Sequence, residues 1–184
     1  MSIRVISGTA KGRKLKAVPG ETTRPVTDKV KEALFNILAG DVIDSNWWDL
    51  FGGTGAIGIE ALSRGASFVR FTDLNRAPVE IMIDNLEHCK FMDQAEVKRA
   101  DAYNMLRMKA DKRFEYIYVA PPQYAEMWSK ALKLVDENME WLTDDGTVIV
   151  QIDPTEYQEL ELENLFEGEQ RRYGSTLLLF YDQK

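Results

Sequence analysis

Cysteine, histidine and long apolar runs are nearly absent from this chain, and each absence excludes a class of protein. Cys89 is the only cysteine and His88 the only histidine among 184 residues, so neither an internal disulfide nor a cysteine-based zinc site can form. We therefore predict no metal site. No apolar run approaches the roughly 18 residues of a membrane-spanning helix, and residues 1–5 show no signal-peptide core. We expect a cytoplasmic protein with no membrane partner.

Positive charge is scarce overall but concentrated near the N-terminus. The chain carries a net charge of −7. Residues 1–40 hold eight Lys and Arg against three Asp and Glu, a charge of +5, which leaves −12 on the remainder. A basic segment on an acidic chain indicates one face that binds an anionic polymer. A solvated charged hairpin would give the same pattern, so both interpretations stay open here.

The basic segment also has its own local structure. Residues 4–8 and 14–18 alternate between apolar and polar positions around a glycine-containing loop, which predicts a β-hairpin. Thr27 can then cap a helix. The length fits a single domain. We predict an N-terminal hairpin arm over residues 1–24 and one domain over residues 25–184.

The stretch from Asp49 to Gly58 reads DLFGGTGAIG and organises the rest of the chain. An apolar run stops at glycines and a helical pattern starts at once, which predicts a strand, a tight turn and a helix N-terminus. Glycine permits positive φ and close approach of a ligand. The helix N-terminus offers unpaired N–H groups. An ordinary turn whose glycines serve only backbone geometry is the alternative.

An acidic residue in register makes a nucleotide-like ligand the stronger interpretation of that turn. Gly53, Gly55 and Gly58 match the dinucleotide-binding fingerprint, and Asp73 follows about 20 residues on, where ribose hydroxyls bind. NAD and S-adenosylmethionine both carry adenosine and both could use such a turn. The two cofactors stay open at this point.

Strands and helices alternate along the rest of the chain, which predicts an α/β fold with a mostly parallel sheet. Ligands of such sheets bind at the carboxyl ends of the strands. Asp101 ends a third predicted strand, where it could accept from an adenine amino group or cap a helix. Pro121 and Pro122 end a fourth. Because neither proline has an N–H group, their carbonyls can accept hydrogen bonds, and Tyr124 adds a flat face for a planar amine.

Taken together, these motifs closely resemble the RsmD family of small-subunit ribosomal RNA guanine-N2 methyltransferases, which are class I S-adenosylmethionine-dependent enzymes. The resemblance runs almost end to end. Beyond the glycine turn, Asp73, Asp101 and the two prolines, it rests on Arg4-Val5-Ile6-Ser7-Gly8, Gly12-Arg13-Lys14-Leu15, Arg24-Pro25-Val26-Thr27-Asp28, Lys31-Glu32-Ala33-Leu34-Phe35-Asn36 and Arg172-Tyr173-Gly174.

The resemblance implies a Rossmann-like, mostly parallel seven-stranded sheet with an antiparallel last strand and an N-terminal hairpin arm. It also implies S-adenosylmethionine as cofactor, transfer of a methyl group to guanine N2, and small-subunit ribosomal RNA in an assembling particle as partner of a monomeric enzyme. The implied cofactor-binding residues are Asp49, Phe51, Gly53, Thr54, Gly55, Asp73, Asp101, Ala102 and Ala120. The implied catalytic residues are Pro121, Pro122, Gln123 and Tyr124. The implied RNA-binding residues are Arg4, Lys11, Arg13, Lys14, Arg24, Lys31 and Asn36.

The chain departs from the family pattern after the fourth strand. The family has Asp or Asn, then two prolines, then an aromatic residue, whereas this chain has Ala120 in the first place and Gln123 in the last. The family's side chain would accept a hydrogen from the guanine amine, and alanine cannot. We expect the backbone carbonyls near Pro121 to take over, helped by Gln123 or Tyr124. A cofactor-binding protein without catalysis, or a methyltransferase with another target, are the alternatives.

Overall fold

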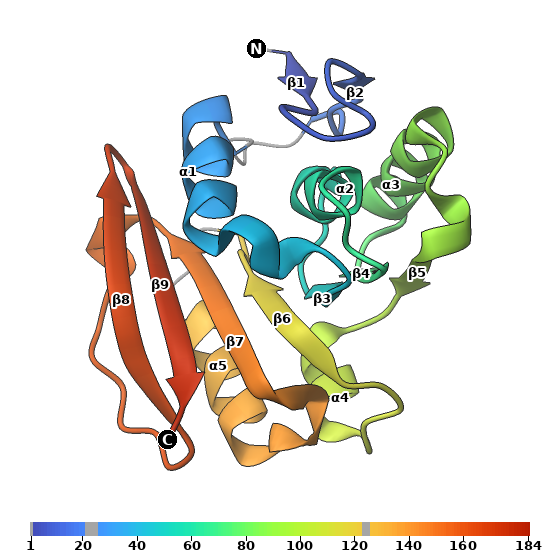
Figure 1. Ribbon diagram of the computed structural model, residues 1–184. Helices are drawn as coiled ribbons and strands as arrows, with labels where there is room; N and C mark the ends of the chain where they lie inside the picture. The colour runs from blue at the N-terminus through green and yellow to red at the C-terminus, as the bar shows by residue number, and fades with distance from the viewer. Residues whose placement is uncertain (1, 21–25, 123–125) are drawn as a thin grey trace.

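A computed structural model describes residues 2–20, 26–122 and 126–184 of the chain. A twisted sheet with helices on both faces forms its centre (Figure 1). The strands are β1 Ile3–Arg4, β2 Lys14–Leu15, β3 Asn46–Asp49, β4 Phe68–Asp73, β5 Ala95–Arg99, β6 Phe114–Val119, β7 Leu142–Ile152, β8 Leu165–Tyr173 and β9 Thr176–Gln183. The helices are α1 Asp28–Leu38, α2 Ala56–Ser63, α3 Arg76–Cys89, α4 Ala102–Arg107 and α5 Met127–Glu137, with 3₁₀ turns at Ala39–Val42, Met92–Gln94, Met139–Trp141 and Pro154–Glu156. Within these described ranges, no helix is long and apolar enough to cross a membrane.

The large sheet has seven strands in the order β5-β4-β3-β6-β7-β9-β8. Neighbours from β5 to β7 pair in parallel, and β9 pairs antiparallel with both β7 and β8. The predicted sheet, with its antiparallel last strand, is confirmed. Because β5, β4, β3 and β6 are neighbours in the sheet and parallel, their carboxyl ends lie together, and the residues that follow them meet there. This row of carboxyl ends is the edge at which a ligand would bind.

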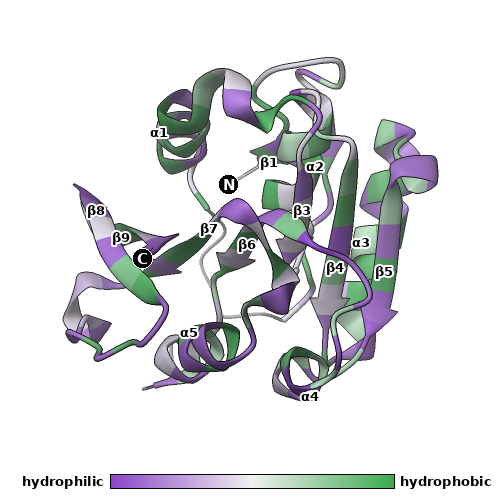
Figure 2. Cartoon of the chain, turned by 60° about the horizontal axis from the view of Figure 1, so that its bottom comes forward, coloured by the Kyte–Doolittle hydropathy of each residue, from purple (hydrophilic) through white to green (hydrophobic). Residues whose placement is uncertain are grey.

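Two cores cover the two faces of this sheet, and successive tryptophans of β3 show the alternation. Both Trp47 and Trp48 are fully buried. The Trp47 ring stacks on Phe35 of α1 at 5.5 Å between centroids, on the face covered by α1, α2 and α3. The Trp48 ring lies 4.7 Å from Trp141, on the face covered by α4 and α5. Figure 2 shows hydrophobic residues along the strands and on α1.

The N-terminal hairpin (β1 and β2) docks on the end of α2. The backbone oxygen of Ser63 accepts from the Thr9 N–H at 2.8 Å. The Ser63 hydroxyl accepts from the Ala10 N–H at 2.9 Å and donates to the Ser7 carbonyl at 2.6 Å. Apolar residues of the hairpin join the core beneath α1, α2 and α3. The hairpin therefore has a fixed position above α2 and α3 (Figure 1).

One buried amide connects the hairpin to the glycine turn. The Asn85 side chain, on α3, accepts from the Lys16 N–H at 2.8 Å and donates to the Lys16 carbonyl at 3.1 Å. The same amide nitrogen donates to the Thr54 carbonyl at 2.9 Å. The Asn85 side chain thus connects the N-terminal hairpin to the glycine turn, two features that the sequence predicted separately.

One predicted helix is shorter than expected. The apolar periodicity that starts at Met127 predicts a helix as far as Trp141, but α5 ends at Glu137. Asn138 leaves the helix because its side-chain amide donates to the Leu106 and Met108 carbonyls, at 3.1 and 2.9 Å. A 3₁₀ turn follows, and β7 begins at Leu142.

Candidate cofactor and RNA site

Four strand ends meet at one edge of the sheet, as the sequence predicted. The Gly52 N–H donates to the Thr72 carbonyl at 2.7 Å, and the Gly53 N–H donates to Asp73 Oδ2 at 3.1 Å. The Ala100 N–H donates to the Asp73 carbonyl at 3.0 Å. These bonds join the ends of β3, β4 and β5 side by side.

The glycine turn has the backbone that only glycine adopts without strain. Gly53 and Gly55 have φ values of +56° and +81°. A Cβ added at Gly53 would meet no described atom within 4 Å, so the turn has open space on that side. The Thr54 hydroxyl accepts from the Ala56 N–H at 3.3 Å, at the start of α2. The turn thus presents backbone N–H groups and a helix N-terminus to the edge.

Asp49 is the buried carboxyl beneath this turn. It is 2% exposed, and its Oδ2 accepts from the Gly58 N–H at 3.3 Å. Burial raises the pKa of Asp49 well above its ordinary 3.8, and the charge of Asp73 adds to the rise. A cationic partner would favour the ionised form. This carboxyl therefore suits an amino group of a ligand.

Asp73 and Asp101 hold the neighbouring strand ends. Asp73 Oδ1 accepts from the Asn75 N–H at 3.0 Å. Asp101 Oδ1 caps α4, accepting from the Tyr103 and Asn104 N–H groups at 2.8 and 3.2 Å. The helix-cap interpretation of Asp101 is confirmed, and its position at the edge next to Asp73 also agrees with the cofactor interpretation.

Aromatic and apolar side chains complete the edge. Phe51 meets Tyr103 edge to face, with ring centroids 6.0 Å apart, and Ala102 beside them is buried. Leu74 is 59% exposed directly after Asp73. Sequence reasoning missed Leu74 and Tyr103, although an apolar residue directly after a strand-ending acid is a signal that could have found Leu74.

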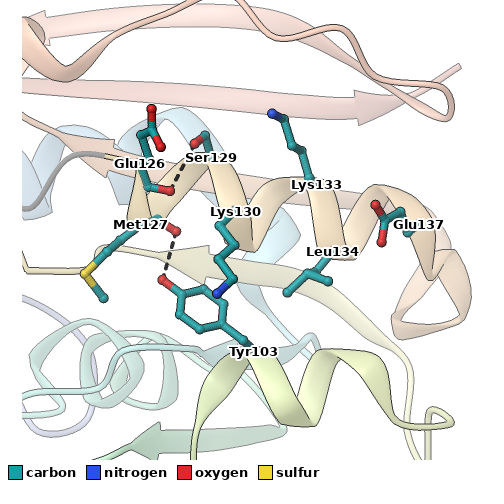
Figure 3. Close-up of a pocket in the computed structure, with 8 residues that line it drawn as sticks. All are labelled: Tyr103, Glu126, Met127, Ser129, Lys130, Lys133, Leu134 and Glu137. Carbon is teal, nitrogen blue, oxygen red and sulfur yellow. Dashed lines mark hydrogen bonds between the residues drawn. The ribbon is translucent and has the colours of Figure 1, made fainter.

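The second half of the predicted site is described only in part. Ala120, Pro121 and Pro122 are half-buried after β6. Gln123 and Tyr124, predicted as catalytic, lie outside the described residues. A hollow of about 560 Å³ follows along α5, where the Tyr103 hydroxyl donates to the Met127 carbonyl at 3.2 Å and Lys130 Nζ lies 4.3 Å from the Tyr103 ring centroid (Figure 3). None of the predicted site residues that the structure describes lines this hollow.

The predicted RNA-binding residues divide into exposed and buried groups. Lys11 and Lys14 are exposed on the hairpin. Arg4 is exposed and pairs with Asp28 at 2.9 Å, while half-buried Arg13 donates to the His88 carbonyl at 2.6 Å. Asn36 is exposed on α1, and Arg24 lies outside the described residues.

Lys31 differs from the others because its side chain is buried. It is 1% exposed, and its ammonium donates to the Arg4 carbonyl. Burial lowers the pKa of Lys31, and nearby Glu60 partly offsets the effect. In this position Lys31 holds the hairpin onto α1 and presents no ammonium at the surface.

Comparison with known proteins places this architecture in a family. The model of the family described as conserved hypothetical protein 95 matches residues 3–182. The Bacillus subtilis protein named "Putative rRNA methyltransferase YlbH" is 37% identical and covers 99% of this chain and 100% of its own length. Escherichia coli "Ribosomal RNA small subunit methyltransferase D" is 35% identical over 81% of this chain and 74% of its own.

A solved structure agrees with these sequence matches. The structure described as "Putative methyltransferase yhhF from Escherichia coli" superposes with a TM-score of 0.86 at 32% identity, over 100% of this chain and 99% of that one. The chain therefore belongs to the conserved hypothetical protein 95 family, the RsmD/YlbH family of class I methyltransferases, and its cofactor is S-adenosylmethionine rather than NAD.

Proposed function

We propose that this chain transfers a methyl group from S-adenosylmethionine to the exocyclic N2 of a guanine in small-subunit ribosomal RNA. The observation that carries the proposal is a basic hairpin that Asn85 connects to the glycine turn, in a chain that is 35% identical to Escherichia coli ribosomal RNA small subunit methyltransferase D. The exposed Lys11 and Lys14 would contact RNA phosphates, and the base would leave its stack to reach the edge.

The residues at the edge fit the cofactor. Asp49 would hold its amino group, Asp73 its ribose hydroxyls and Asp101 its adenine, with the open side of Gly53 against the chain of the ligand. S-adenosylmethionine supplies a methyl group that is already activated, so no side chain has to act as a nucleophile. The protein then positions the target amine and excludes water. Pro121 and Pro122 have no N–H groups to compete for the acceptors at this edge.

The proposal is tested by methyl transfer from labelled S-adenosylmethionine to small-subunit particles that lack the modification, followed by identification of the methylated nucleoside. N2-methylguanosine is the expected product, formed faster in particles than in protein-free RNA because the acidic body repels bare RNA. Methylation of another nucleoside would overturn the guanine-N2 assignment. Ala120 favours one second candidate, a cofactor-binding RNA-interaction protein, which predicts no transfer at all.

Cofactor affinity is expected to fall at low pH through Asp49. Because burial raises the pKa of this carboxyl, it becomes protonated as the pH falls through that raised value, and it then no longer attracts an amino group. The stability of the unliganded protein changes in the opposite direction. Because the pKa of Asp49 is higher in the folded than in the unfolded state, this group lowers the free energy of unfolding as the pH rises above 3.8. Calorimetric titration of S-adenosylhomocysteine against pH measures the first effect. Asp49→Asn should bind weakly with a flat profile, and a wild-type profile equally flat would contradict the assignment.

Removing two exposed hairpin cations is expected to weaken RNA binding in a salt-dependent way. For Lys11→Ala/Lys14→Ala, the slope of log affinity against log salt should become shallower by about 1.4–1.8, because each lost phosphate contact contributes about 0.7–0.9. Filter binding to small-subunit RNA measures the slope. The matched control is Arg107→Ala/Lys109→Ala, which removes two exposed cations at and just after the C-terminal end of α4. Equal losses in the two double variants would show that general charge, and not the hairpin, binds the RNA.

A further inference from the structure

Ala120 stands where the family has an acid or amide that accepts from the target amine, and an alanine side chain cannot accept. The register of β6 and β7 shows what stands beside that position. Val119 pairs with Val150 in parallel. Ala120 and Gln151 each follow by one residue, so they lie next to one another at the same edge of the sheet.

The side chains of both residues also belong to the same face. Ala120 packs against the core beneath α1, α2 and α3, which includes Tyr118 and Ile149. Tyr118 and Ile149 are themselves cross-strand partners. Side chains alternate along a strand, so Gln151 projects to this face too. Its half-buried position confirms that it is neither core nor fully solvated.

A buried hydroxyl fixes the Gln151 amide. The Tyr118 hydroxyl donates to Gln151 Oε1, and Tyr118 is 1% exposed. In the parallel pairing of β3 with β6, Tyr118 lies opposite Asp49, the buried carboxyl of the cofactor edge. Tyr118 therefore lies between Asp49 at the cofactor edge and the Gln151 amide beside Ala120.

We propose that Gln151 takes the place of the absent acid or amide and binds the target guanine by its amine edge. A carbonyl oxygen has two acceptor sites. Oε1 uses one for Tyr118, and the second accepts from the guanine N2 amine, while the amide N–H donates to the adjacent ring nitrogen N3. Adenine has no amine on that edge, so the same contact selects guanine. The inference rests on the proposed function and assigns Tyr118 as the residue that positions Gln151.

The test compares methyl transfer to small-subunit particles by wild type, Gln151→Leu, and Gln151→Leu/Ala120→Asp. Gln151→Leu should lower kcat by about 100-fold to 1,000-fold, in the range seen when one hydrogen-bonding group is removed from a reacting centre, with little change in KM for the particle. S-adenosylhomocysteine affinity should stay close to wild type, while Tm should fall, because the buried Tyr118 hydroxyl loses its acceptor. Ala120→Asp in the same chain should restore transfer, because it returns an acceptor to the neighbouring position. Gln158→Leu, at an exposed site, is the matched control.

Each outcome decides between the two proposals. Loss of transfer in Gln151→Leu with rescue by Ala120→Asp supports the inference, since a structural defect would not be rescued there. An active wild type with an equally active Gln151→Leu overturns the inference and leaves the proposed function standing. Loss without rescue by Ala120→Asp also overturns it, in favour of a structural role of Gln151. An inactive wild type overturns both. Tyr118→Phe should lower kcat by a smaller factor than Gln151→Leu and leave KM unchanged.

Discussion

Replacing Arg70 with alanine is expected to lower the free energy of unfolding by about 2–5 kcal/mol, mainly through the packing that is lost. The Arg70 side chain is 3% exposed. Its guanidinium makes two hydrogen bonds to Asp111, at 2.9 and 2.8 Å, and one to Glu96 at 2.9 Å. It also lies 5.3 Å from the ring centroids of both Trp48 and Phe114. Alanine would leave a cavity beside these rings and remove the hydrogen bonds to both carboxylates, although Glu96 keeps its ion pair with Lys98 at 3.1 Å.

The pH dependence of this effect identifies its electrostatic part. The hydrogen bonds from Arg70 hold the pKa of Asp111 below its ordinary 3.8. A lowered folded pKa gives stability that is present above 3.8 and is lost as the pH falls through the folded value. The difference in the free energy of unfolding between wild type and Arg70→Ala should therefore become smaller below about pH 4. The difference that remains there is due to packing.

Urea titration at several pH values measures the Arg70 effect. Arg76→Ala is the control, because Arg76 forms an exposed pair with Glu80 and such pairs contribute about 0–1 kcal/mol. A loss of stability in Arg70→Ala no larger than in Arg76→Ala would contradict the expected role of the buried arginine.

Gly8→Ala is expected to undock the hairpin, lowering transfer to RNA at least about 10-fold while S-adenosylhomocysteine still binds. A Cβ at Gly8 would lie 1.8 Å from the Ser63 carbonyl oxygen. That oxygen belongs to the backbone of α2 and cannot move aside. The positive φ of +87° adds strain for any other residue. Overpacking of this kind typically destabilises by about 1–3 kcal/mol.

Gly12 provides a matched control for that variant. Its φ is +85°, nearly the same as that of Gly8, but a Cβ there would meet no described atom within 4 Å. Gly12→Ala therefore carries the backbone strain without the clash. Proteolysis within residues 1–20 and methyl transfer should both distinguish the two variants. Equal behaviour would mean that the contact with Ser63 does not hold the hairpin.

The features that the sequence predicted well are local in the chain. The glycine turn, Asp73 and the hairpin can each be recognised from a few consecutive residues, because turn chemistry and alternation depend on near neighbours. The polar strand β8 lacked such a signal. It lies at the edge of the sheet with Glu169, Gln170 and Arg171 exposed, so no alternation of apolar residues marks it.

The features that could not be predicted depend on contacts between distant segments. Lys31 resembled a surface cation until the fold placed it beneath Arg4. Gln151 follows Ala120 by 31 positions in the sequence, and only the pairing of β6 with β7 brings the two together. Asn138 ends α5 by donating to the Leu106 carbonyl within α4 and to the Met108 carbonyl just after it. Helical periodicity carries no information on such partners.

The place of β9 in the sheet has a consequence for the order of assembly during synthesis. β9 is the last strand of the chain, yet it lies between β7 and β8 and pairs with both. β8 leaves the ribosome first but has to wait for Thr176–Gln183 before it can join the sheet. Translation and sheet formation thus proceed in different orders at this end of the molecule. A nascent chain that stops before β9 would hold β7 as an open, apolar edge, which is the kind of surface that chaperones and aggregation partners recognise.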